Sequence, residues 1–167
     1  RNEPAEIANA VLGRKDLVGD QRLVYVLDLT QPTGMFEARD FLIRDGDTVV
    51  VPTGVGEPPA LLHALSARRH SLRGVAVSQI LPLRKFAYID PETRTHIRHD
   101  AYFFGGATRA GGQAGWVDYV PAYFSELPML IDRGLLPAEV VVSLASPMDE
   151  HGYFSLSLAP DYTMAAI

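Results

Sequence analysis

The stretch TVVVPTGVGEPPALLHAL, from Thr48 to Leu65, decides the fold class of this chain. Its first part, Thr48 to Pro52, is a β-branched apolar run typical of strands buried on both faces of a parallel sheet. The turn Gly54-Val55-Gly56 follows. Glu57-Pro58 then opens a helix that runs to about Arg69, because a proline and an acidic residue both suit a first helical turn. The pattern is strand, glycine turn and helix.

The same alternation extends along the rest of the chain. We predict further strands at Arg22–Leu29, Gly74–Leu81, Tyr102–Phe104, Val117–Phe124 and Ala138–Ala145, and helices at Pro4–Leu12, Phe36–Ile43 and Glu126–Arg133. Residues 31–34 predict a turn, and Gly152–Leu158 alternates like an edge or antiparallel strand. Strands that alternate with helices form an open, mostly parallel α/β sheet flanked by helices. Such sheets bind ligands at the carboxyl ends of their strands.

Composition excludes several classes of function. The 167 residues suffice for one domain with a core, and 47% hydrophobic with 21% charged residues are globular values. The net charge of -5 argues against a nucleic-acid binder and against attraction to an anionic membrane. The absence of cysteine excludes thiolate nucleophiles, Cys-ligated zinc, iron–sulfur clusters and disulfides.

The chain also lacks the marks of membrane insertion and secretion. No apolar stretch approaches the roughly 18 residues that a spanning helix needs. The opening residues, Arg1 to Pro4, lack the basic-then-apolar order of a signal peptide. We therefore expect a soluble, cytoplasmic protein.

Both chain ends indicate a piece of a longer protein. The chain begins with Arg1 rather than methionine. Near the other end, Pro160-Asp161 predicts a helix start, and Tyr162 to Ile167 then runs apolar without a helix stop signal. We expect a domain that is truncated before a C-terminal domain.

The glycine turn is the first candidate site. It lies after a strand and before a helix, where free backbone N–H groups can accept a negative charge. It is neither a P-loop nor a G-x-G-x-x-G motif, because the lysine and hydroxyl are missing and position 59 is Pro59. Since Glu57 would repel a phosphate, a carboxylate or a thioester carbonyl is the better ligand. A tight turn that binds nothing is the alternative.

A second candidate is Phe104 to Arg109, where a predicted strand ends in the glycine pair Gly105-Gly106. Arg109 could hold a carboxylate. The alternative, which this motif by itself favours, is a solvated turn followed by a helix.

A third candidate is the turn from Ser146 to Tyr153, which contains two acids and a histidine and follows a predicted strand. It should therefore lie at the same edge of the sheet as the glycine turn. Neighbouring loop residues rarely point at one centre, so an ordinary turn is the alternative. No histidine spacing matches a metal motif such as H-E-x-x-H, and we expect no metal. There is also no G-x-S-x-G nucleophile motif.

Four motifs in order resemble one family. They are G-x-G-E-P at Gly54–Pro58, FFGGATR at Phe103–Arg109, DYVPAYFSELP at Asp118–Pro128 and SPMDEHGYFSL at Ser146–Leu156. Together they resemble the N-terminal half of the acetyl-CoA hydrolase/transferase family, and within it the 4-hydroxybutyrate and butyrate:acetate CoA-transferases. The resemblance covers Met35 to Ile167, and residues 1–34 form an N-terminal extension of unclear role.

The resemblance implies an α/β domain of the CoA-transferase superfamily in a cytoplasmic homodimer or higher oligomer. In this family a glutamate attacks an acyl-CoA, forming an acyl-glutamyl anhydride and then a glutamyl-CoA thioester. That glutamate and most of the CoA site belong to the second half of such proteins, so Glu57, Glu126 and Glu150 are not the nucleophile. No cofactor is tightly bound, and CoA is a substrate. By motif position the implied substrate-binding residues are Gly54, Val55, Gly56, Glu57, Pro58, Gly105, Gly106, Glu150, His151, Gly152 and Tyr153.

Three alternatives remain open from the sequence. Water could replace the acceptor carboxylate, which would make the enzyme an acyl-CoA hydrolase. The chain could instead be a non-catalytic subunit that binds or scaffolds. Sugar-phosphate isomerisation is disfavoured, because Glu57 stands where such an enzyme needs phosphate.

Overall fold

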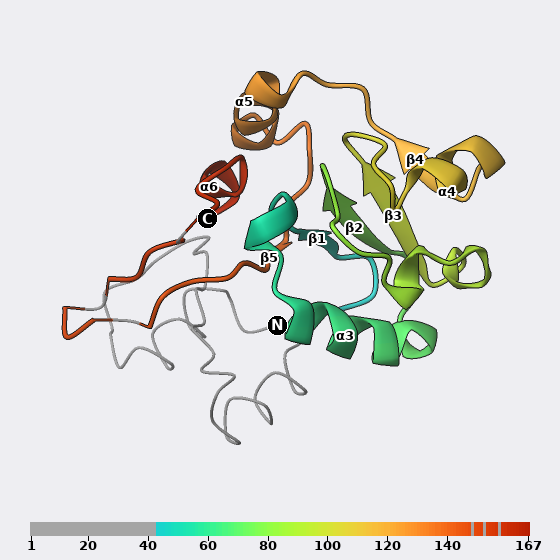
Figure 1. Cartoon of the computed structure of the whole chain (residues 1–167), viewed down its shortest axis with the longest axis horizontal. Helices are drawn as coiled ribbons and strands as arrows, with labels where there is room; N and C mark the ends of the chain where they lie inside the picture. The colour runs from blue at the N-terminus through green and yellow to red at the C-terminus, as the bar shows by residue number, and fades with distance from the viewer. Residues whose placement is uncertain (1–42, 148, 152, 157) are drawn as a thin grey trace.

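The computed structural model describes residues 43–147, 149–151, 153–156 and 158–167. Its centre is a five-stranded sheet in the order β4-β3-β2-β1-β5, with every pair parallel (Figure 1). The strands are β1 (Thr48–Val50), β2 (Val75–Gln79), β3 (Ile97–Ala101), β4 (Val117–Tyr119) and β5 (Val140–Val141). The predicted open parallel α/β sheet is confirmed.

Helices and short 3-10 turns flank the sheet. The helices are α3 (Pro59–Arg68), α4 (Arg109–Ala114), α5 (Leu127–Asp132) and α6 (Thr163–Ala166). The 3-10 turns are η1 (Gly54–Gly56), η2 (Arg69–Ser71), η3 (Ala87–Ile89), η4 (Pro91–Thr93) and η5 (Phe124–Glu126). None of the helices in the described part of the chain has the length and apolar content needed to span a bilayer.

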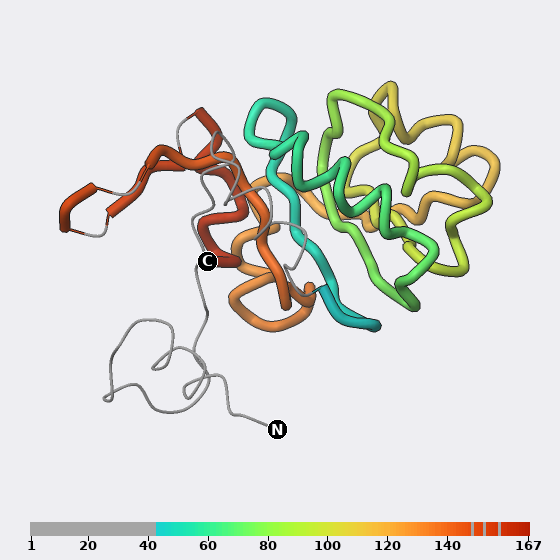
Figure 2. Tube along the Cα trace, turned by 90° about the horizontal axis from the view of Figure 1, so that it is seen from below, coloured from blue at the N-terminus to red at the C-terminus, as the bar shows by residue number. Residues whose placement is uncertain are grey.

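The core lies on both faces of the sheet because side chains alternate along β1. Val49 belongs to a buried cluster that includes Leu62 of α3. Val50 belongs to a second cluster that includes Leu127 of α5 and Tyr162 beside α6. Figure 2 shows α3 and α5 on opposite sides of β1. The apolar run was therefore correctly predicted to be buried on both faces.

The strand order places a topological switch at β1. From β1 the chain proceeds outward through β2, β3 and β4, and it then returns to pair β5 with the opposite edge of β1. Ligands of open α/β sheets bind in the crevice outside such a switch point, at the strand carboxyl ends. The loop that follows β1 is the glycine turn, so the fold puts the first candidate motif at this position.

One strand lies elsewhere than predicted. Tyr102–Phe104 is not a strand, and β3 occupies the preceding residues, Ile97–Ala101. Its sequence IRHDA includes Arg98 and Asp100, which hid the strand from a search for apolar runs. These two side chains share one face, where they pair with each other in a bidentate contact of 2.7 and 2.9 Å. Opposite charges on the sheet face therefore replace the expected apolar contacts.

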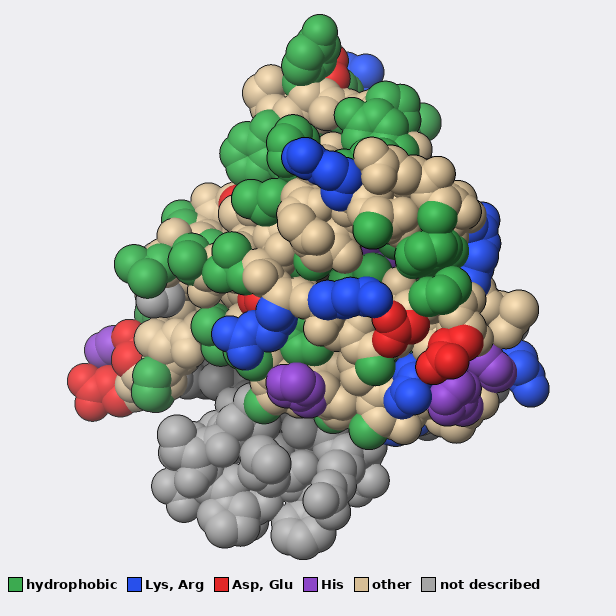
Figure 3. Space-filling model, turned by 45° about the vertical axis from the view of Figure 1, so that its right-hand side comes forward, with side chains coloured by type: hydrophobic (Ala, Val, Ile, Leu, Met, Phe, Trp, Pro, Cys, Tyr) green, Lys and Arg blue, Asp and Glu red, His purple; other side chains and the backbone are tan. Residues whose placement is uncertain are grey.

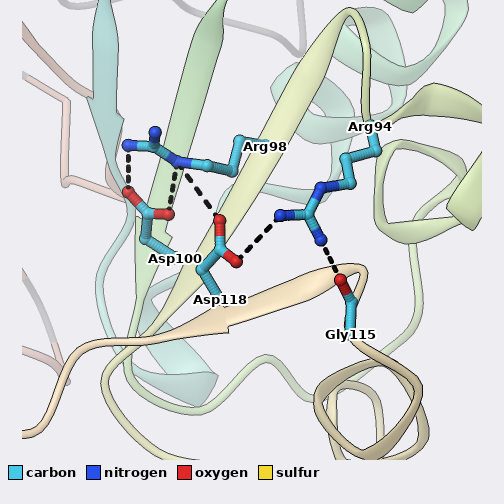
Figure 4. A network of polar contacts seen from close by, with 5 residues as sticks. All are labelled: Arg94, Arg98, Asp100, Gly115 and Asp118. Carbon is cyan, nitrogen blue, oxygen red and sulfur yellow. Dashed lines mark hydrogen bonds and ion pairs between the residues drawn. The ribbon is translucent and has the colours of Figure 1, made fainter.

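The same charged face joins β3 to β4 (Figure 4). Asp118 of β4 lies in register with Asp100, and it contacts Arg98 at 3.7 Å and Arg94 at 3.1 Å. Arg94 also donates to the carbonyl of Gly115. The hydrogen bond with Asp100 raises the pKa of the Arg98 guanidinium further above its ordinary value. Strand pairing at this edge is thus supported by alternating charges.

Several other boundaries also differ from the predictions. Helix α3 begins at Pro59, so Glu57 precedes it and no acidic residue occupies its first turn. Strand β5 is limited to Val140–Val141, and the described part of Gly152–Leu158 contains no strand. Residues 1–42 lie outside the described residues, and with them the N-terminal extension, the predicted helices Pro4–Leu12 and Phe36–Ile43 (apart from Ile43), the strand Arg22–Leu29 and the turn at residues 31–34.

Candidate functional site

The glycine turn needs each of its glycines for a different reason. Gly54 has a φ of +41°, a left-handed conformation that side chains disfavour. Gly56 has no room for a side chain, because an added Cβ would lie 2.6 Å from the Cβ of Ala159 and 3.0 Å from Pro52. The turn is therefore built for one backbone path, packed against the C-terminal segment.

Neighbouring segments hold this turn by its backbone. The N–H of Thr53 donates to Oδ2 of Asp161 at 2.7 Å, and the N–H of Gly54 donates to the carbonyl of Leu81 at 3.0 Å. The carbonyl of Gly56 accepts from the N–H of Leu144 at 3.0 Å. The segments after β1, β2 and β5 and the segment before α6 thus meet at the switch point.

One N–H of the turn remains available. Within the part of the chain that the structure describes, the backbone N–H of Val55 has no hydrogen-bond partner, whereas those of Thr53, Gly54, Gly56 and Glu57 all have one. Val55 also forms the exposed tip of the turn, at 58% exposure. An unpaired donor at a strand's carboxyl end can bind a carbonyl or carboxylate oxygen.

Glu57 points into the protein, away from the exposed tip. It is 3% exposed, and its Oε2 accepts from Nε2 of Gln79 at 3.0 Å and from the N–H of Leu83 at 3.3 Å. Its Oε1 lies 3.8 Å from Nε of Arg84. The sequence treated this carboxylate as part of a ligand pocket. In the structure its hydrogen bonds connect the loop after β1 to the end of β2 and to the loop that follows β2. Pro58, which follows, is buried as well.

The second motif meets the glycine turn through the loop after β2. An added Cβ at Gly105 would lie 2.6 Å from Cδ1 of Leu81, and the N–H of Gly105 donates to Oγ1 of Thr108 at 3.1 Å. Gly106 is exposed with open space around its Cα. Arg109 donates to the carbonyl of Phe104 at 3.4 Å. The structure therefore brings Gly54–Pro58 and Gly105–Gly106 to the same edge.

The third motif lies apart from the first two. Its turn projects away from the sheet in both Figure 1 and Figure 2. The Asp149 carboxylate closes the turn by accepting from the N–H groups of His151 at 2.9 Å and Tyr153 at 2.8 Å. The side chains of Glu150 and His151 are 87% and 71% exposed and lie 3.6 Å apart. No hydrogen bond or ion pair between described residues joins this turn to the glycine turn, and Gly152 lies outside the described residues.

Sequence reasoning missed the apolar character of the strand ends. Large exposed hydrophobic residues follow β1 to β5, and these are Val55, Leu81, Leu83, Phe103, Tyr123 and Leu144. Figure 3 shows several hydrophobic side chains in the upper part of the molecule, with Lys and Arg side chains among them, and the histidines toward the bottom. The available signal was an apolar residue two to five positions after the end of each strand. We call these six residues the apolar rim.

Two ionisable side chains, His99 and Tyr88, are buried in the core and are not exposed at the site. Burial lowers the pKa of His99 to about 4, so its imidazole is neutral near pH 7. Burial, and then the charge of Glu57, raise the pKa of Tyr88 above its ordinary value. Their rings stack with centroids 6.1 Å apart. Both belong to the core and are unsuited to proton exchange with a ligand. The described residues also contain no group of three side chains placed to bind a metal ion.

Comparison with known proteins shows the family of this chain. The family model for the acetyl-CoA hydrolase/transferase N-terminal domain matches residues 5–167. The chain is 43% identical over 126 residues to a succinyl-CoA:cyclohexane-1-carboxylate CoA transferase of Geobacter metallireducens, covering 75% of this chain and 28% of that protein. It is 34% identical over 124 residues to a 4-hydroxybutyrate coenzyme A transferase of Clostridium kluyveri, covering 74% and 29%.

Solved structures show the same relationship. RipA from Yersinia pestis superposes with a TM-score of 0.65 at 28% identity, covering 78% of this chain and 32% of that one. A 4-hydroxybutyrate CoA-transferase from Porphyromonas gingivalis gives 0.53 at 25% identity, covering 79% and 29%. The chain thus spans under a third of these proteins. The family match begins inside residues 1–34, and a separate extension there stays a prediction. The chain belongs to the acetyl-CoA hydrolase/transferase family, whose N-terminal domain it matches.

Proposed function

We propose that this domain works in a CoA-transferase, which moves CoA from an acyl-CoA to a carboxylate through a glutamyl intermediate. The glutamate lies outside this chain, in a C-terminal domain or a partner subunit. The observation that supports the proposal best is the N–H of Val55 at the topological switch point, which has no hydrogen-bond partner among the described residues. Relatives named as CoA transferases support the choice of reaction.

In the proposed reaction CoA passes first from the acyl donor to the glutamate and then from the glutamate to the acceptor. The glutamate carboxylate attacks the thioester, which releases CoA thiolate and leaves an acyl-glutamyl anhydride. The thiolate attacks the glutamyl carbonyl, which releases the first carboxylate and forms glutamyl-CoA. The acceptor carboxylate then attacks the thioester of glutamyl-CoA, which expels CoA thiolate and forms a second anhydride. The thiolate attacks the acceptor's carbonyl in this anhydride, which gives the new acyl-CoA and releases the glutamate carboxylate.

Each of these steps places negative charge on a carbonyl oxygen. A donor that is already oriented stabilises this charge without reorganisation. We assign this role on the acyl side to the N–H of Val55, with the open Gly106 leaving space for the reacting carboxylate. Glu150, His151, Gly152 and Tyr153 would complete the cleft from their projecting turn once the rest of the protein faces them.

The apolar rim indicates the class of acyl group. Leu83 at 60% and Phe103 at 53% exposure offer hydrocarbon surface beside the turn. A carboxylate with an apolar body therefore fits better than one with a second charge. The name of the Geobacter relative pairs cyclohexane-1-carboxylate, which has this character, with succinyl-CoA, whose acyl group carries a second carboxylate.

The test is a transfer assay with the full-length protein. Acyl-CoA consumption is measured without acceptor and with acetate, 4-hydroxybutyrate or cyclohexane-1-carboxylate, and the new acyl-CoA is identified by mass. The proposal predicts consumption that requires an acceptor, with the highest kcat/KM for cyclohexane-1-carboxylate. Free CoA released at the same rate without acceptor would instead establish the hydrolase. Absence of any reaction, with no glutamate nucleophile in the full reading frame or a partner, would leave a non-catalytic subunit.

The proposal includes the setting of the enzyme. CoA is a substrate and no cofactor is tightly bound, which native mass spectrometry of the purified protein checks. A homodimer or larger homo-oligomer is expected, and light scattering measures it. Cytoplasmic placement follows from the use of CoA thioesters inside the cell, and cell fractionation tests it.

A further inference from the structure

We propose that Gln79 is a positioning residue that sets the shape of the glycine turn, and its effect on catalysis rests on the proposed function. Gln79 is the last residue of β2 and is fully buried. Its Nε2 donates to the carbonyl of Pro52 at 2.9 Å and to Oε2 of Glu57 at 3.0 Å. Pro52 precedes the turn and Glu57 follows it. One amide group therefore holds both ends of the turn.

The support for this amide is rigid. Strand β2 lies between β1 and β3, with backbone pairing on both sides. A side chain at its carboxyl end has little freedom, because its backbone is fixed and its surroundings are packed. The N–H of Leu83 adds a second donor to Glu57 at 3.3 Å. The turn after β1 is thus anchored to the central strand and to the loop that follows it.

The turn itself supplies little order. Its internal hydrogen bonds are those from Gly56 N to Thr53 O at 3.0 Å and from Glu57 N to Gly54 O at 3.2 Å. Two glycines allow many backbone paths. Since the direction of the Val55 N–H depends on this path, the external contacts decide where that donor points.

The hydrogen bonding between these two side chains is also incomplete. Among the described residues, Oε1 of Gln79 and Oε1 of Glu57 are buried without a hydrogen-bond partner. A buried oxygen without a hydrogen bond destabilises a protein, although Oε1 of Glu57 keeps its ion-pair contact with Arg84. A local departure of this kind is expected at functional sites. Holding the turn explains it.

The experiment compares Gln79→Met with the wild type in the full-length protein. Hydrogen–deuterium exchange is followed on peptides that contain Thr53 to Glu57, and CoA transfer is measured as kcat and KM. We expect turn exchange about tenfold faster. We also expect kcat about tenfold lower, because a misdirected donor no longer meets the reacting oxygen. The KM for acyl-CoA stays within about twofold, since most of the CoA site lies elsewhere.

A second variant separates positioning from simple destabilisation. In Gln79→Glu the protonated carboxyl can donate to Glu57, whereas the ionised form repels it. Protection of the turn relative to wild type at the same pH should therefore recover as the pH is lowered. Gln79→Met should show no such recovery. This variant keeps the side-chain size, and it tests the inference if Gln79→Met does not fold.

The matched control is Thr93→Val. Thr93 is fully buried, and its Oγ1 lies at hydrogen-bond distance from the carbonyls of Asp90 at 2.7 Å and Tyr88 at 2.9 Å, neither of which belongs to the turn. The Thr93→Val variant should lose a buried hydrogen bond, as Gln79→Met does, and leave hydrogen–deuterium exchange of the turn unchanged. Wild-type exchange in Gln79→Met, or equal acceleration in Thr93→Val, would overturn the inference. Faster turn exchange in Gln79→Met with a wild type that transfers no CoA would refute the proposed function and leave the positioning role standing.

Discussion

The backbone N–H of Thr53 and the carboxylate of Asp161 are joined by a 2.7 Å hydrogen bond across 108 residues of sequence. The other oxygen of Asp161 accepts from the N–H of Thr163 at 3.0 Å, at the start of α6. The first contact fixes the glycine turn. The second lies just before α6, whose N-cap is Tyr162 rather than the Asp161 that the sequence predicted. One side chain thereby connects the turn to the C-terminal segment.

Replacing Asp161 with alanine should therefore destabilise the protein by about 2 kcal/mol, because a carboxylate that accepts from two backbone N–H groups is lost. Asp161→Asn should lose less, since it keeps an acceptor oxygen. The free energy of unfolding from urea titration measures both. Asp132→Ala, at an exposed position of α5, serves as the control and should stay near wild type.

The N–H of Val55 can be tested by removing it without removing the turn. Val55→Pro lacks the donor, so kcat for CoA transfer should fall about 100-fold. Val55→Ala keeps the donor and should remain within a few-fold of wild type. Circular dichroism confirms the fold of both variants. Equal activity of the two variants would exclude the N–H from catalysis.

Gly56 should not tolerate a methyl group. Gly56→Ala places a Cβ 2.6 Å from Ala159, so the C-terminal segment must move, at a cost of about 1–3 kcal/mol. Gly106→Ala is the matched control, because nothing lies within 4 Å of its added Cβ. The free energy of unfolding from urea titration should be lower for Gly56→Ala than for Gly106→Ala. A Gly56→Ala protein as stable as the wild type would show that the turn is not packed against Ala159.

His99 makes stability depend on pH. Burial lowers its folded-state pKa from 6.5 to about 4, so the unfolded chain binds the proton first as the pH falls. As the pH falls from about 6.5 to 4, the contribution of His99 should lower the free energy of unfolding. Below about pH 4 this contribution should stay constant. The total is about 3 kcal/mol at 1.4 kcal/mol per pKa unit.

The measurement is the unfolding free energy at pH 7.5 and 4.5. His99→Phe keeps an aromatic ring against Tyr88, and it should lose most of the difference between the two pH values. His151→Gln alters an exposed histidine and should keep the wild-type difference. A His99→Phe protein with an unchanged pH dependence would contradict the assignment.

The predicted elements succeeded where apolar pattern and packing agree. The run at Thr48–Val50 is apolar on both faces, and the structure buries both faces. Strand β3 was missed because Arg98 and Asp100 pair with each other, a contact that no single-strand pattern reveals. The turn from Glu150 to Tyr153 followed a predicted strand, yet it projects from the sheet, since the direction of a long connection depends on its packing partners.

The sequence by itself determined the strand, the glycine turn, the helix and the family, because these depend on local backbone preference and on motif order. Tertiary structure decided the use of the residues around the turn. Glu57 is directed inward by Gln79 and Leu83, which lie 22 and 26 residues further along the chain. Hydrogen bonds over such separations follow from strand order and register, and these are set only when the sheet assembles.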